Sequence, residues 1–109
     1  MTQLYIPAAF IDDARDSIEC RIEQGATPEW ASLFEKMTSG DAVRKGRGWS
    51  VLVDLTPDEL RALTDEAEYK NEYWNTDAYG VKESGCTIRQ YADAAKRLFV
   101  RLQAMDSGR

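Results

Sequence analysis

The stretch VLVDLTPDELRAL, residues 51–63, combines a strand pattern with a helix start. Alternation of apolar and polar residues with β-branched side chains is typical of a strand. Pro57 cannot donate to a sheet but suits the first turn of a helix. Thr56 and Glu59 have the spacing of a capping box. The sequence therefore predicts a strand that runs directly into a capped helix, with one face made by Trp49, Val51, Val53 and Leu55.

The start of this helix is also a candidate anion site, because helix N-termini present free N–H groups. Asp58 and Glu59 lie in the first turn and would repel an anion. We therefore interpret the junction as a structural joint and not as a binding site.

The N-terminal stretch LYIPAAFIDDARDSI, residues 4–18, repeats the pattern more faintly. It predicts a strand over residues 2–6 and a helix over 7–24 that ends at Gly25. Thr27 and Pro28 open a second helix in the same way, which fades near residues 39–40. The two helices carry apolar faces made by Phe10, Ile11, Ala14, Ile18 and Ile22 and by Trp30, Leu33, Phe34 and Met37.

The second half predicts two further helices. The third spans residues 57–75, and the fourth begins at a second capping pattern, Thr87 with Gln90, and continues to residue 105. Residues 76–86 are irregular. The expected inward positions are Leu60, Leu63, Ala67 and Trp74 in the third helix and Ile88, Tyr91, Ala95, Leu98, Leu102 and Met105 in the fourth.

The predicted fold class is α+β, mostly α, in a single domain over residues 1–109. Two β-α-α units, 2–40 and 49–105, flank a flexible basic connection over 41–48. The order of elements makes the two strands antiparallel neighbours with four helices packed on them. A two-stranded ribbon is marginal alone, so either the helices supply the core or free strand edges pair in a homodimer. Monomer and homodimer both remain open.

The composition limits the chemistry. The net charge of −5 disfavours direct nucleic-acid binding. The chain has no histidine, which removes histidine-based catalysis and the usual zinc sites. We expect no metal and no cofactor. No apolar run reaches the ~20 residues of a membrane span, so we expect a cytoplasmic protein.

The two cysteines do not have the spacing of a metal site. Cys20 falls about 180° from Ile11 on the helix and is expected to be an exposed free thiol, which suits a reducing compartment. A disulfide between Cys20 and Cys86 is the alternative.

An aromatic and acidic flank of the third helix is the candidate partner-binding surface. Tyrosine is enriched at interface centres, and carboxylates steer a partner. The alternative is that the tyrosines pack against the fourth helix. In the same way, the basic run at 44–47 is either a solvated loop or a contact for an acidic partner. The candidate partner-binding residues are Glu66, Tyr69, Glu72, Tyr73, Asp77 and Tyr79.

The stretch LTPDELRAL, the acidic helix with tyrosine and tryptophan after it, and the closing YADAAKRLFVRLQA are similar to small orphan proteins of bacteriophages that infect actinobacteria. The similarity covers residues 51–105 and includes no catalytic motif. It implies a cytoplasmic protein, made during infection, that binds and redirects a host factor.

Three functions remain. The first is a protein-binding module, phage-encoded, that redirects or inhibits a host or phage protein. The second is an acidic mimic of nucleic acid that inhibits a DNA-binding protein. The third is an enzyme, which we do not expect, because neighbouring carboxylates such as Asp12 and Asp13 diverge by ~100° on a helix and do not converge on a substrate.

Overall fold

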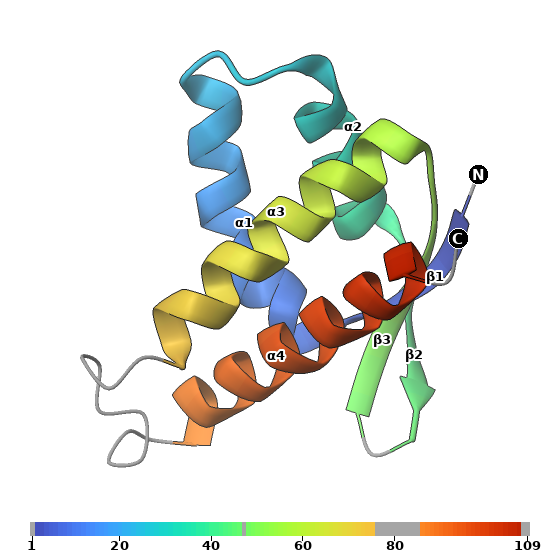
Figure 1. The fold of residues 1–109 in the computed structure, drawn as a ribbon, viewed down its shortest axis with the longest axis vertical. Helices are drawn as coiled ribbons and strands as arrows, with labels where there is room; N and C mark the ends of the chain where they lie inside the picture. The colour runs from blue at the N-terminus through green and yellow to red at the C-terminus, as the bar shows by residue number, and fades with distance from the viewer. Residues whose placement is uncertain (1, 47, 76–85, 108–109) are drawn as a thin grey trace. The chain divides into compact units, whose positions relative to one another are not determined.

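The computed structural model describes residues 2–46, 48–75 and 86–107, and the side chains of these residues except 86–88 and 106–107. Within this part of the chain, four helices and a three-stranded antiparallel sheet form a mostly helical α+β fold (Figure 1). The chain divides into two compact units, Met1–Leu63 and Thr64–Arg109. The elements in order are β1 (Thr2–Pro7), α1 (Ala8–Glu23), α2 (Pro28–Ser39), β2 (Ala42–Lys45), β3 (Gly48–Leu55), α3 (Pro57–Trp74) and α4 (Cys86–Ser107).

The two strands expected from the sequence are antiparallel neighbours, as predicted. Leu4 of β1 pairs with Val53 of β3, and Ile6 pairs with Val51. All four side chains are buried, and they share one face because each pair points to the same side of the sheet. Helix α1 contacts β1 and β3, and α2 contacts β3. The strand alternation in the sequence thus identified the core face of the sheet.

The expectation of a flexible connection over residues 41–48, and of a ribbon with two strands, is wrong. Residues 42–45 form β2, which pairs with β3 and gives the sheet order β1-β3-β2. Gly46 has a φ of +64° in the connection, a conformation that costs glycine little. All four residues of this short basic segment pair with β3. These backbone contacts make it a strand although its sequence has no apolar alternation.

Trp49 also differs from its expected place. It has the same strand parity as Val51, yet 55% of its surface is exposed. Its partner across the sheet is Arg44 of the edge strand, near the hairpin turn. The core face of β3 therefore ends at Val51, and Trp49 lies beyond the buried side chains.

The apolar faces of α1 and α2 are largely confirmed. Their buried positions include Phe10, Ile18, Leu33 and Met37. The φ of Gly25 is +89°, consistent with a glycine that ends α1. The cap of α2 is different from the expected one, since Thr27 donates its hydroxyl to Glu29 and makes no side-chain capping bond.

The second compact unit joins the C-terminal part of α3 to α4. The Asn75 side-chain amide donates to the carbonyl oxygen of Ala92 at 3.1 Å, and the rings of Trp74 and Tyr91 lie 6.1 Å apart. Ala95, Leu98 and Leu102 of α4 are buried, as predicted from their spacing. The expected capping pair Thr87 and Gln90, the inward position of Ile88 and the Cys86 thiol involve side chains outside the described residues.

Candidate functional site

The junction between β3 and α3 is closed by the predicted capping box. The Thr56 N–H donates to Glu59 Oε1 at 2.8 Å, and the Glu59 N–H donates back to Thr56 Oγ1 at 3.2 Å. Two N–H groups that a helix start leaves free are satisfied in this way. Pro57 occupies the first helical position, where its missing N–H costs nothing.

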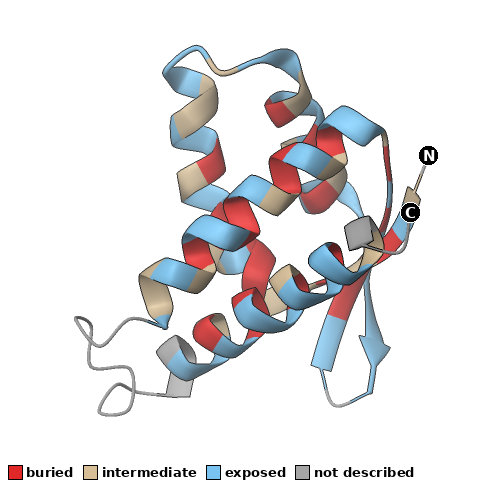
Figure 2. Cartoon of the chain, viewed as in Figure 1, coloured by how far each residue is buried: buried red, intermediate tan, exposed pale blue. Residues whose placement is uncertain are grey.

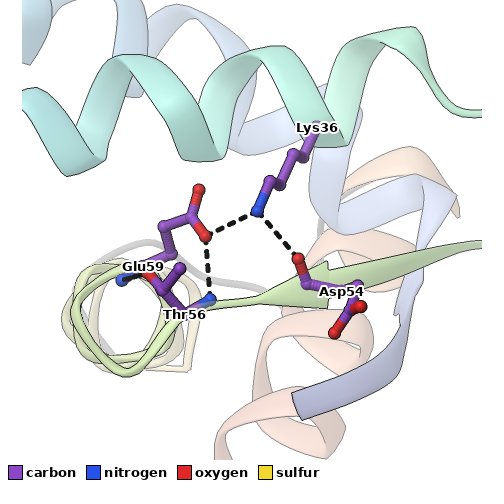
Figure 3. A network of polar contacts seen from close by, with 4 residues as sticks. All are labelled: Lys36, Asp54, Thr56 and Glu59. Carbon is purple, nitrogen blue, oxygen red and sulfur yellow. Dashed lines mark hydrogen bonds and ion pairs between the residues drawn. The ribbon is translucent and has the colours of Figure 1, made fainter. Parts of the chain in front are cut away.

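Lys36 adds a contact that the sequence did not predict (Figure 3). Its ammonium lies 2.7 Å from Glu59 Oε1 and donates to the carbonyl oxygen of Asp54 at 2.8 Å. Lys36 belongs to α2, Asp54 to β3 and Glu59 to α3. One side chain therefore ties three elements of the first compact unit together.

The burial of Glu59 sets its electrostatics. Burial alone would raise the pKa of this carboxyl group, but hydrogen bonds from Lys36 and Thr56, with a further one from Ser32, outweigh it and lower the pKa from 4.5 to about 2. The carboxylate thus remains charged because Lys36 and the Thr56 N–H both donate to its Oε1. The predicted capping box is therefore present, and Lys36 extends its contacts to α2.

A cluster of aromatic rings lies at the end of α3 in the second compact unit. The rings of Tyr69 and Tyr73 are stacked, with centroids 6.0 Å apart and planes at 20°. Tyr73 meets Trp74 edge to face at 4.7 Å, and Trp74 in turn contacts Tyr91 of α4. The cluster is anchored at one end on α4, while 46% of the Tyr69 surface is exposed at the other.

Lys70 lies against the same rings. Its ammonium is 5.7 Å from the centroid of Tyr69 and 5.5 Å from that of Tyr73, within reach of a cation–π contact. The Lys70 residue is only 8% exposed. Tyr69 therefore has a stacked ring and an ammonium group beside it, although nearly half of its surface is exposed.

Carboxylates surround Tyr69 on the exposed side of α3. Asp65 precedes it by one helical turn, Glu72 follows it by three residues, and Glu68 lies beside them. All three are exposed. We call the four residues Asp65, Glu68, Tyr69 and Glu72 the Tyr69 surface.

The candidate residues from the sequence fall in different places. Tyr69 and Glu72 are exposed on one side of α3, and Tyr73 is half-buried beneath Tyr69. Glu66 has no exposed surface, which corrects its expected position at the rim. Asp77 and Tyr79 lie outside the described residues.

Glu66 was misplaced because the buried stripe of α3 includes charged residues. Leu60, assigned to the core from the pattern, is only half-buried, while Glu59, Glu66 and Lys70 are buried. These three positions follow the spacing of a helical face, together with Ala62, Leu63 and Ala67. A pattern of apolar residues alone cannot identify a face that buries charge.

Sequence reasoning also missed Asp65 and Lys70, whereas the contact between Trp74 and Tyr91 agrees with the inward positions expected for both. Asp65 precedes Tyr69 by four residues, and this spacing could have placed both on the same side of the helix. Among the described residues, no group of three or more cysteine, aspartate or glutamate side chains is placed to hold a metal ion. No described helix is long and apolar enough to cross a membrane.

Comparisons with protein-family models, with curated proteins and with solved structures gave no match.

Proposed function

We propose that this protein is a small binding module that uses the Tyr69 surface to bind another protein. The expected partner presents basic side chains around an apolar centre, which receives the Tyr69 ring. In keeping with the resemblance to phage proteins, the partner is a host or phage protein, and the binding takes place in the cytoplasm of the infected cell. Binding redirects or inhibits the partner.

The observation that supports this proposal is the combination of exposure and constraint at Tyr69. Single exposed aromatic side chains are common and need no function. Tyr69 differs because Tyr73 stacks on it and the Lys70 ammonium lies near its ring. A side chain already held in one conformation loses little conformational entropy on binding, and tyrosine is frequent among the residues that dominate binding energy.

The charges around Tyr69 define the kind of partner. Asp65, Glu68 and Glu72 are exposed on the same side of the helix. Carboxylates at the rim of an interface attract a basic surface and raise the association rate. The chain as a whole carries a net charge of −5, which acts in the same direction.

A mimic of nucleic acid is the second candidate function. The same three carboxylates recur at i, i+3 and i+7, and so form a row along one side of α3. A row of negative charge suits a DNA-binding protein, which is built to contact phosphates. For such an inhibitor the carboxylates would dominate binding, and the Tyr69 ring would contribute little.

A photo-crosslinking experiment tests the proposal. We would place a benzoylphenylalanine at position 69 and, as a control, at the exposed position of Arg15 in α1, and irradiate each protein in an actinobacterial lysate. The partner crosslinked only from position 69 would then be purified and its affinity measured. Tyr69→Ala should weaken that affinity more than Glu72→Gln if the proposal is right. The reverse order would favour the nucleic-acid mimic, and unchanged affinity in both variants would reject the surface.

A further inference from the structure

The β2–β3 hairpin of the first compact unit carries an unusual share of exposed apolar surface. Among the described residues, the large hydrophobic side chains that are exposed are Val43, Trp49, Leu52, Tyr69 and Val100. The first three belong to this hairpin, at 43%, 55% and 46% exposure. Figure 2 shows β2 and the adjoining end of β3 as exposed. By the strand register, Val43 and Leu52 lie on one face of the hairpin and Trp49 on the other, so apolar side chains are exposed on both faces.

Strand β2 also lies at the edge of the sheet. The order β1-β3-β2 gives it one strand partner, and all four of its residues are exposed. Alternate backbone N–H and C=O groups of an edge strand point away from the sheet and can pair with another chain. An extended peptide that adds itself to such an edge gains backbone hydrogen bonds along its length.

The hairpin is basic although the chain is acidic. Residues 42–49, AVRKGRGW, contain Arg44, Lys45 and Arg47 and no acidic residue. Arg44 lies opposite Trp49 in the ladder. The Lys45 ammonium lies 4.3 Å from the centroid of the Tyr5 ring. Charge and apolar surface therefore occur together along this edge.

We propose that the free edge of β2 binds an extended acidic segment of a partner protein, which adds a fourth strand to the sheet. Acidic side chains of the segment would lie beside Arg44 on one face. Its apolar side chains would lie beside Val43, on the face that also presents Leu52. This surface shares no residue with the Tyr69 surface and does not depend on the function proposed for it.

The charges argue against two other occupants. Antiparallel pairing of β2 with β2 of a second copy would bring Arg44 and Lys45 of both copies into one short ribbon, and opposed like charges destabilise a sheet. A nucleic acid would meet the same basic side chains, but its backbone has no amide N–H and C=O groups to pair with the free edge of β2. An extended peptide has both.

Fluorescence anisotropy with labelled probes tests the proposal on the full chain. The main probe is a short capped peptide in which glutamate alternates with valine. One control peptide has lysine in place of glutamate, and a second has alternate backbone nitrogens methylated. We expect the first peptide to bind, the lysine peptide not to bind, and methylation to weaken binding at least about tenfold, because it removes the hydrogen bonds of the added strand.

Charge variants test the site of binding. Arg44→Glu with Lys45→Glu should weaken binding of the glutamate peptide at least about tenfold. Arg15→Glu with Lys96→Glu changes the net charge equally at exposed positions outside the hairpin and should have little effect. Arg44→Gln with Lys45→Gln should give an intermediate loss, which separates removal of charge from repulsion. Circular dichroism would verify that each variant is folded.

Several results would overturn the proposal. They are no binding of the glutamate peptide, equal binding of the methylated peptide, and equal losses in the two pairs of charge reversals. Tighter binding of a thymidine oligonucleotide than of the peptide would instead assign the hairpin to nucleic acid. Tyr69→Ala should leave peptide binding unchanged, so failure at one surface does not bear on the other.

Discussion

Lys36 Nζ lies 2.7 Å from Glu59 Oε1 and joins α2 to the first turn of α3. The Glu59 side chain is 3% exposed and that of Lys36 is 32% exposed. A buried carboxylate is costly unless donors surround it, so this pair and the capping box depend on each other. The contact fixes where α3 begins within the first compact unit.

Because of Glu59, the stability of the fold should decrease at low pH. The pKa of its carboxyl group is about 2 in the folded chain against a usual 4.5, so the unfolded chain takes up the proton first as the pH falls. The stabilisation is complete above about pH 4.5 and is lost as the pH falls from there toward 2. It corresponds to about 3 kcal/mol. Urea unfolding of wild type and Glu59→Gln should show a difference at pH 7 that shrinks toward pH 2; a difference that is constant with pH would contradict this.

Replacing only Lys36 should lower the unfolding free energy more than replacing both Lys36 and Glu59. Lys36→Met leaves the buried Glu59 carboxylate without its main donor and should cost about 2 kcal/mol or more of unfolding free energy. The double variant Lys36→Met with Glu59→Gln should recover part of that loss. Denaturant unfolding of the four proteins at pH 7 measures the coupling. Lys96→Met, at an exposed position of α4, is the control and should change little.

The two threonines before prolines offer a matched comparison. Thr56 Oγ1 accepts the Glu59 N–H, whereas Thr27 makes no capping bond to α2. Thr56→Ala should therefore cost about 1 kcal/mol, and Thr27→Ala clearly less. Thermal unfolding of both variants compares them directly. Equal losses would mean that the capping bond itself contributes nothing.

Short sequence patterns predicted the structural features that are determined by residues close together in the chain. The strand alternation, the Thr56–Glu59 capping box and the helix-ending Gly25 are each set within a few residues, and each is found in the structure. The hairpin strand β2 was missed because a short basic segment has no pattern of its own. It is a strand because β3 offers it an edge. Gly46 was the available signal for a hairpin, because glycine readily adopts the positive φ that tight hairpin turns require.

The candidate surface was predicted only in part for a related reason. Whether a charged residue is buried depends on donors from elements distant in sequence, as Lys36 is for Glu59. Helical spacing alone placed Glu66 at a rim and Leu60 in the core, and the structure reverses their order of burial. Tyr69 and Glu72 are exposed on α3. For the tyrosine flank, the sequence had left open both exposure and packing against the fourth helix.

Cys20 should be reactive in the folded protein. It is a free, exposed thiol, and its sulfur accepts one hydrogen bond from the Gln24 side chain at 3.4 Å. In a Cys86→Ser variant, a thiol reagent should label the chain stoichiometrically without denaturant. Mass spectrometry before and after unfolding measures the labelling. Protection in the native state would place Cys20 in an interface and favour self-association through α1.

Substitutions of Tyr69 and Tyr73 should have different effects on stability if the Tyr69 surface binds a partner. Tyr69 is largely exposed, so Tyr69→Ala should change the unfolding free energy by only about 0.5 kcal/mol. Tyr73 is half-buried and meets Trp74 edge to face, so Tyr73→Ala should cost about 1–3 kcal/mol. Denaturant unfolding measures both. Equal stability losses would mean that the two rings form one structural unit.

The same variants should differ in their dissociation from the crosslinked partner. Tyr69→Ala should speed dissociation by a factor that corresponds to about 2 kcal/mol if the ring is at the centre of the interface. Glu72→Gln should instead slow association and reduce its dependence on salt, because a rim carboxylate acts mainly by steering. Biolayer interferometry on the proteins used for unfolding gives both rates. If Tyr69→Ala dissociates like wild type while Tyr73→Ala only unfolds more easily, the tyrosines serve the packing of the second compact unit, and the binding surface lies elsewhere.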